Sequence, residues 1–167
     1  VIVLGADARY HRLVSAAGLA GLEVFDLTGA RVGAVPAGEA GGLDVRYGFL
    51  IKGKPETLLV STDKTDNSLR FFAMREGAPV EVGARSAPLG FAVEDVCLLH
   101  NASDGGFYAV AVGDGGEIEQ QLLYVNDQGQ VDARSARRIT LPSKIKYCVA
   151  DDATGQLYVS QQAVGIW

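Results

Sequence analysis

The stretch TLLVSTDKTDNSLRFFAMREG, residues 57–77, contains the pattern that decides the fold. A short apolar run rich in β-branched residues leads into a polar turn. A second apolar run with two aromatics follows, and it ends in a charged turn closed by glycine. Paired runs of this kind are typical of two antiparallel β-strands joined by a hairpin. Similar pairs occur at residues 12–29, 108–129 and, in shorter form, 157–167.

These pairs form a repeat. Val14, Val60, Val110 and Val159 mark the same point in each copy, at intervals of 46 to 50 residues. A period of about 40–50 residues fits the four-stranded blade of a β-propeller. A further strand precedes each of the last three copies, at 43–51, 91–100 and 145–155, and we expect these strands to line the central channel. No long window shows the 3.6-residue period of a helix.

The sequence therefore predicts an all-β fold, a β-propeller of four-stranded antiparallel blades. The chain is expected to form one partial propeller domain, 1–167, with blades at about 1–36, 42–83, 90–141 and 145–167. The last blade is incomplete, so about three and a half blades are present. An open arc of blades leaves unpaired edges. The expected partners are therefore the remaining blades or a second copy of the chain. The chain also lacks an initiator Met, which we interpret as processing or as part of a longer protein.

Composition excludes some classes of function. The net charge of −5 argues against a nucleic-acid partner, because phosphate contacts need clustered Lys and Arg. The most basic stretch, residues 133–146, is interpreted as a solvated strand face. No apolar run approaches the ~20 residues of a membrane helix, so no membrane partner is expected. Cys97 and Cys148 lie in apolar strands, where buried reduced thiols are favoured and a disulfide remains an alternative.

Four motifs carry a family resemblance. They are CVADDATGQLYVSQQAVGIW (148–167), GGLDVRYGF (41–49), GLEVFDLTG (21–29) and GEIEQQLL (116–123). Together they resemble the β-propeller phytases, secreted calcium-dependent hydrolases that remove phosphate from phytate, the hexakisphosphate of myo-inositol. The resemblance implies a six-bladed propeller of which this chain matches about the first half. It also implies a secreted or periplasmic location, calcium as the cofactor and inositol phosphate as a partner.

The resemblance nominates candidate site residues, each with a structural alternative. Asp44 and Arg46 are phosphate or ligand candidates that could equally pair across strands. Lys64 is a phosphate candidate in a loop that could be a solvated turn. Asp151 and Asp152 are weak metal candidates, since ADDATGQ is also a good hairpin turn. Asp114, Glu117 and Glu119 could form an acidic site, but a solvent-exposed strand edge is favoured.

Several positions depart from the family's pattern. Its paired lysines fall on Gly18 and Leu19, its Lys-Glu pair on Asp114 and Gly115, and its Asn-Asp-rich entry to the DVR strand on Gly41 and Gly42. A glutamate of the family falls on Lys146, and an acidic pair on Gln161 and Gln162. Hard cations take oxygen ligands, preferably charged ones. The substitutions therefore argue against a catalytic site and against calcium in this segment.

Three functions follow from these observations. The favoured one is a catalytically degenerate phytase-like segment, an accessory or substrate-capturing module of a phytate hydrolase. One alternative is an active calcium-dependent 3-phytase, a phosphoric monoester hydrolase completed by further residues. The other is a propeller that binds a protein or a glycan. Whether the segment is itself an enzyme is left open by the sequence.

Overall fold

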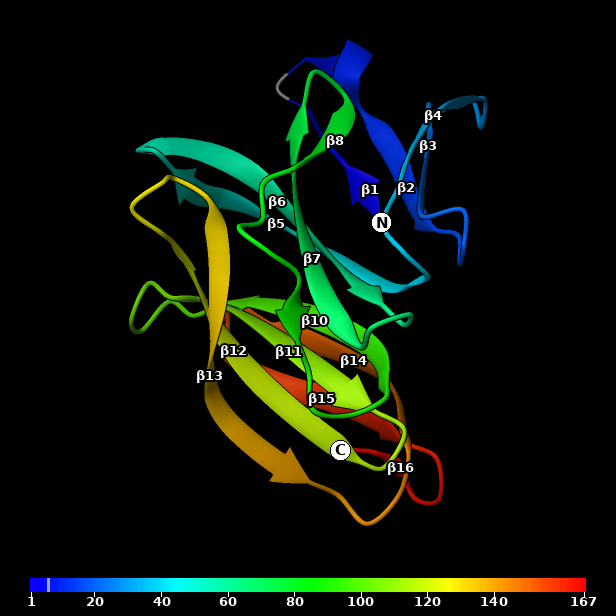
Figure 1. The fold of residues 1–167 in the computed structure, drawn as a ribbon, viewed down its shortest axis with the longest axis vertical. Coiled ribbons are helices and arrows are strands. Elements are labelled where there is room, and N and C mark those ends of the chain that lie inside the picture. Colours follow the sequence, from blue (N-terminus) through cyan, green and yellow to red (C-terminus); the bar gives the residue numbers. More distant parts are fainter. Residues whose placement is uncertain (6) are drawn as a thin grey trace.

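The computed structural model describes residues 1–5 and 7–167. It is built from four antiparallel β-sheets that follow one another along the chain and are arranged as propeller blades (Figure 1). The predicted fold class is confirmed. Among the described residues the helical structure is a single 3₁₀ turn, η1 (Ala8–Tyr10). No helix in this part of the chain has the length and apolarity to cross a membrane.

The first two sheets come from the first half of the chain. The first contains β1 (Ile2–Val3), β2 (Arg12–Ala16), β3 (Leu22–Phe25) and β4 (Arg31–Val35), paired in that order. The second contains β5 (Ala40–Ile51), β6 (Lys54–Asp63), β7 (Ser68–Arg75) and β8 (Ala78–Glu81). A short additional strand, β9 (Ala87–Pro88), also pairs with β7. The second sheet thus has one strand more than the expected four.

The other two sheets come from the second half. The third contains β10 (Val93–His100), β11 (Phe107–Gly113), β12 (Glu117–Val125) and β13 (Val131–Thr140). The fourth contains β14 (Ile145–Asp151), β15 (Gln156–Gln161) and β16 (Gly165–Ile166). The four marker valines all lie in the second strand of their sheets and are all buried. The repeat seen in the sequence is therefore a repeat of sheets.

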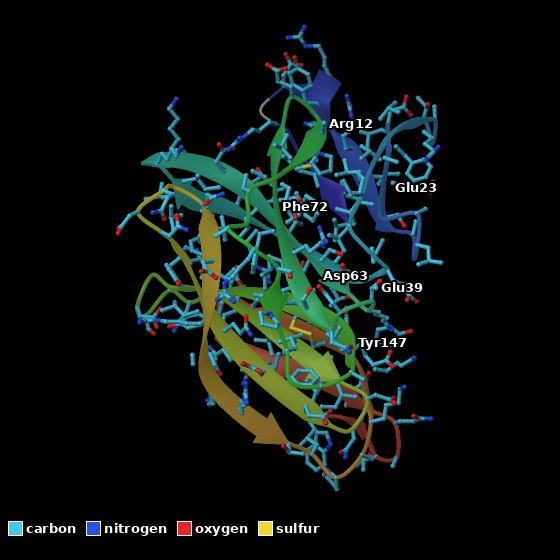
Figure 2. All side chains as sticks on the ribbon, in the orientation of Figure 1. Arg12, Glu23, Glu39, Asp63, Phe72 and Tyr147 are labelled. Atoms are coloured by element: carbon cyan, nitrogen blue, oxygen red, sulfur yellow. A yellow bond between two sulfur atoms is a disulfide. The ribbon has the colours of Figure 1, made fainter. Side chains whose placement is uncertain are left out.

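Adjacent sheets pack face to face, and three apolar clusters fill the spaces between them. One joins the first and second sheets, another the second and third, and another the third and fourth. Phe71 and Phe72 show how β7 contributes side chains to two of these clusters. Consecutive side chains of a strand point to opposite faces, so Phe71 packs toward the third sheet. Phe72, labelled in Figure 2, packs toward the first. A sheet buried on both faces needs nearly continuous apolar strands, which explains the sequence of this stretch.

The first strands of the last three sheets lie side by side. β5 contacts β10, and β10 contacts β14. Carboxylates reinforce this packing: Asp44 accepts a hydrogen bond from the Leu98 amide at 2.7 Å, and Asp95 accepts one from the Cys148 amide at 3.1 Å. Each bond joins the first strand of one sheet to the first strand of the next.

A disulfide links two of these strands. Cys97 of β10 and Cys148 of β14 are bonded, with 5.8 Å between their Cα atoms. The expectation of reduced thiols is therefore wrong. The residues are 51 positions apart in the chain, so only the packing of the third sheet on the fourth brings them together.

Candidate functional site

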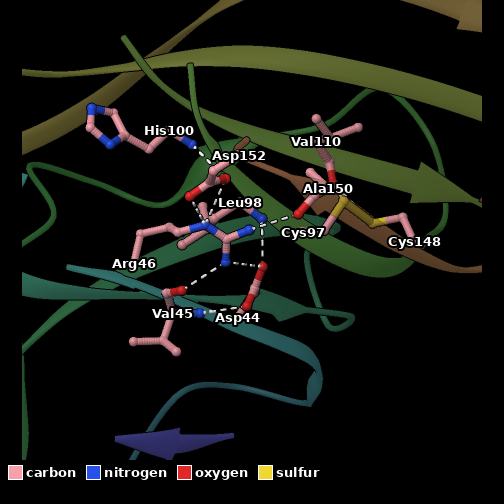
Figure 3. Close-up of polar contacts among 10 residues, drawn as sticks. All are labelled: Asp44, Val45, Arg46, Cys97, Leu98, His100, Val110, Cys148, Ala150 and Asp152. Carbon is pink, nitrogen blue, oxygen red and sulfur yellow. Dashed lines mark hydrogen bonds and ion pairs between the residues drawn. A yellow bond between two sulfur atoms is a disulfide. The ribbon is translucent and has the colours of Figure 1, made fainter. Parts of the chain in front are cut away.

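Arg46 is the centre of a polar network between sheets (Figure 3). Its Nε donates to both carboxylate oxygens of Asp152, at 2.9 and 3.1 Å. Its Nη1 donates to Asp44 at 3.1 Å and to the Val45 carbonyl at 2.8 Å, and its Nη2 donates to the Ala150 carbonyl at 3.0 Å. Most of the N–H donors of the guanidinium are thus hydrogen-bonded within the protein. It fastens β5 to the end of β14.

The carboxylates around Arg46 have partners of their own. Asp44 accepts a hydrogen bond from the Leu98 amide, and Asp152 accepts one from the His100 amide at 3.0 Å. Both amides belong to β10, so the second, the third and the fourth sheets meet at this network. The structure therefore brings Asp44, Arg46 and Asp152 together, although the sequence analysis assigned them to different ligands.

Asp151 lies apart from that network, as the last residue of β14 before the hairpin turn to β15. Its carboxylate accepts hydrogen bonds from the Thr154 hydroxyl at 2.8 Å and from the Ala153 amide at 2.9 Å. The Thr154 hydroxyl, together with the Ala153 amide, lowers the pKa of the exposed Asp151 carboxyl. Its bonds are those of an aspartate that stabilises a turn.

Lys64 belongs to a different group, which we call the lysine cluster: Lys64, Lys144 and Lys146 around Glu94. The Glu94 carboxylate accepts Lys144 Nζ at 2.7 Å on one oxygen, and Lys64 Nζ at 3.1 Å and Lys146 Nζ at 3.2 Å on the other. Lys64 follows β6, Glu94 lies in β10, and Lys144 and Lys146 lie at the start of β14. Asp63 and Tyr147, chain neighbours of Lys64 and Lys146, are labelled in Figure 2.

The ion pairs of the lysine cluster shift the pKa values of Glu94 and Lys144. Burial acts to raise the pKa of Glu94, but the hydrogen bonds from Lys144, Lys64 and Lys146 outweigh it and lower the pKa to about 2. Lys144 also pairs with Asp114, in the turn after β11. Asp114, followed by Glu94, raises the pKa of Lys144. Three ammonium groups thus face two carboxylates, which leaves the cluster positive.

A groove opens beside the lysine cluster. It is lined by residues of the fourth sheet and its loops, both polar and apolar: Lys144, Lys146, Tyr147, Ser160, Gln161, Gln162, Gly165 and Ile166. Gln161 is buried, and its amide donates to the Ser143 hydroxyl at 2.9 Å while its carbonyl accepts from Trp167 Nε1 at 2.7 Å. The groove thus offers ammonium groups and neutral side chains to a ligand.

The donor set does not fit the calcium that the resemblance implies. No three His, Cys, Asp or Glu side chains gather at metal-binding distance within residues 1–5 and 7–167. Glu94 and Asp114 are ion-paired with lysines, and Asp44 and Asp152 with Arg46. A divalent cation would have to displace these ammonium and guanidinium groups or approach them against like charge.

The acidic stretch after β11 is also arranged differently from the prediction. Glu119 is 1% exposed and pairs with Arg138 of β13 at 3.1 Å. Its expected place on a solvent-exposed edge is wrong, because its strand, β12, lies inside the third sheet, between β11 and β13. Asp114 joins Lys144 instead, so Asp114, Glu117 and Glu119 do not form one acidic site.

Sequence reasoning missed two members of the lysine cluster, Glu94 and Lys144, and read Lys146 only as the loss of an acid. Lys144 and Lys146 are two positions apart in the chain, but no local motif joins them to Lys64 or Glu94, which come from the second and third sheets. The one available signal was the repeat: Glu94 and Lys146 both stand near the start of the first strand of their sheets.

The geometry defines a segment of a β-propeller in which the second, third and fourth sheets together form the lysine cluster, at the edge that we call the rim. A family model described as Phytase matches residues 1–167, so the chain belongs to the phytase family. It is 26% identical to the 3-phytase of Bacillus subtilis (strain 168), over 93% of this chain and 43% of the relative. The chain thus spans less than half the length of that relative. These matches confirm the resemblance.

Proposed function

We propose that this segment is a catalytically degenerate part of a phytase-type propeller that captures phytate without hydrolysing it. The observation that supports the proposal most directly is the lysine cluster, in which ammonium groups from two sheets surround a single carboxylate. Lysine is a common binder of phosphate groups. The segment would act as a substrate-capturing accessory module of a phytate hydrolase.

The lack of turnover follows from the residues at this rim. Hydrolysis of a phosphate ester in the metal-dependent way needs a cation that lowers the pKa of a bound water. Here the carboxylates near the rim are neutralised by lysines, and Gln161 and Gln162 offer only uncharged oxygens. Asp44, Arg46 and Asp152 hold sheets together in this proposal, and Asp151 stabilises a turn. Lys64 is the sequence candidate that retains a ligand role.

An active 3-phytase is the second candidate, because the similarity to the Bacillus subtilis 3-phytase extends along 93% of this chain. In that case further residues would supply the metal ligands. The disulfide supports a secreted or periplasmic location for either candidate, since disulfides persist in oxidising compartments.

The proposed partners include further blades of a propeller. Tyr147 and Val149 of β14 and Tyr158 of β15 are exposed, and Val149 is paired directly with Tyr158. The opposite face of the same sheet packs on the third sheet. The exposed face therefore has the chemistry of a blade surface that another blade would cover.

The test combines turnover with binding. Phosphate release from phytate would be measured at millimolar calcium, with the Bacillus subtilis 3-phytase as the positive control. Phytate binding would be measured by isothermal titration calorimetry. We expect binding without release. Release above background that is lost in Lys64→Ala would favour the active enzyme, and no phytate binding would reject the capture function.

A further inference from the structure

The lysine cluster has donors that the protein does not use. An ammonium group carries three N–H donors. Lys64 and Lys146 each have one partner, Glu94, and Lys144 has two, Glu94 and Asp114. Their side chains are 27 to 49% exposed, whereas Glu94 is 14% exposed. The carboxylate therefore lies beneath the ammonium groups, which remain open to solvent.

We propose that the lysine cluster binds the phosphate groups of its ligand directly, with its ammonium groups in the place of a divalent cation. This inference rests on the proposed function and specifies its chemistry: capture is independent of calcium. The ligand class is a small molecule that carries several phosphomonoester groups.

Glu94 holds the three ammonium groups of the lysine cluster in position. Lys64 Nζ and Lys146 Nζ lie within 3.2 Å of the same carboxylate oxygen, and Lys144 Nζ lies 2.7 Å from the other. Long lysine side chains normally lose considerable rotamer freedom when they bind a ligand. Here much of that freedom is already lost in the folded protein. A phosphate group at the exposed side of the nitrogens therefore meets donors that are already placed.

The charge balance favours an anion over a cation at this rim. Lys64, Lys144 and Lys146 outnumber Glu94 and Asp114, the carboxylates with which they form ion pairs, while the neighbouring Asp95 accepts a hydrogen bond from the Cys148 amide. Charges this close together interact strongly at a partly buried site, attracting when opposite and repelling when alike. A phosphate dianion gains from each ammonium group, whereas a calcium ion is repelled by each. The adjacent groove adds the exposed Gln162 as a neutral partner for a further phosphate.

The experiment compares phytate binding by calorimetry in EDTA and in calcium, with Lys64→Gln, Lys144→Gln and Lys146→Gln. The matched control is Lys54→Gln, an exposed lysine at the opposite end of β6 from Lys64. In EDTA we expect the parent and the control to bind equally, and each cluster variant to lose about tenfold in affinity, the value of one charge-assisted hydrogen bond. Lys146 is the most exposed of the three, so its variant perturbs the fold least. Thermal melts would verify folding.

Each other outcome has a distinct meaning. Binding that appears only in calcium would overturn the metal-independent cluster but leave phytate capture standing. Binding in EDTA that all three glutamine variants retain would place the site elsewhere and also overturn it. No binding in either buffer would reject the proposed function itself. Inorganic phosphate, tested as a second ligand, should bind much more weakly than phytate; equal affinity would contradict a ligand with several phosphates.

Discussion

At the residue scale, the network around Arg46 shows why two charged side chains can sit on one strand between packed sheets. Burying a charge is costly unless it is paired and hydrogen-bonded. Arg46 meets this condition with Asp44, Asp152 and two backbone carbonyls. Its planar fork reaches all of them at once, which the point charge of a lysine cannot do.

Removal of Arg46 should therefore destabilise the protein much more than removal of a surface arginine. For Arg46→Ala we expect a loss of about 3 kcal/mol in the free energy of unfolding, because two carboxylates lose their counter-charge. Arg9, whose pair with Asp7 is exposed, is the control, and Arg9→Ala should cost less than about 1 kcal/mol. Urea unfolding of both variants gives the values. Similar losses for the two would mean that the network contributes little.

The lowered pKa of Glu94 predicts how the free energy of unfolding depends on pH. Its pKa falls from 4.5 to about 2 in the folded protein, so the unfolded state binds the proton more tightly. The stabilisation is fully present above pH ~4.5 and is lost as the pH falls toward about 2. We expect the parent to lose stability over this window and Glu94→Gln to show a smaller loss, because it lacks the titrating group. Urea midpoints between pH 5 and pH 2 measure the slope, and an unchanged slope in Glu94→Gln would disprove the assignment.

At the element scale, the start of β5 depends on glycine. A Cβ atom on Gly42 would stand 2.7 Å from the Val96 nitrogen and 2.9 Å from the Asp95 Cα. Both atoms belong to the backbone of β10, so they cannot move aside without shifting the strand. Gly42 therefore permits the close approach of β5 and β10 that places Asp44 next to the Leu98 amide. Glycine at position 42 thus has a packing role.

A methyl group at position 42 should separate these two strands. We expect Gly42→Ala to cost about 1–3 kcal/mol in unfolding free energy through overpacking. Gly33→Ala is the matched control, since Gly33 also lies in a strand, β4, and a Cβ there meets no atom within 4 Å. Its stability should stay within about 0.5 kcal/mol of the parent. If Gly42→Ala unfolds at the same urea concentration as Gly33→Ala, the stability of the protein does not depend on the close approach of β5 and β10.

At the scale of the whole molecule, the disulfide joins the third sheet to the fourth across 51 residues of chain. Loop-closure entropy predicts a stabilisation of about 4 kcal/mol for a loop of this length. We expect a reducing agent to lower the melting temperature of the parent. The double variant Cys97→Ser, Cys148→Ser should melt below the oxidised parent and at the same temperature with and without reductant. A parent that melts equally with and without reductant would show that the link adds nothing to stability.

Several features of the fold could be predicted from the sequence because they depend on local pattern and on repetition. The strand pairs around Val14, Val60, Val110 and Val159 were located correctly, since β-branched runs and turn residues signal strands directly. Their period identified the propeller. The i, i+2 spacing of Asp44 and Arg46 also placed them on one face of β5, where they pair.

The strands, their order and the family could thus be predicted from the sequence, because each depends on neighbouring residues or on a repeat of them. Which side chains meet became clear from the packed sheets alone: Cys97 with Cys148, Arg46 with Asp152, and Lys64 with Lys144 and Lys146 around Glu94. These partners lie 30 to 106 positions apart in the chain. The physical reason is that blade packing brings them together, and packing depends on the exact angle and spacing between sheets, which no local pattern specifies.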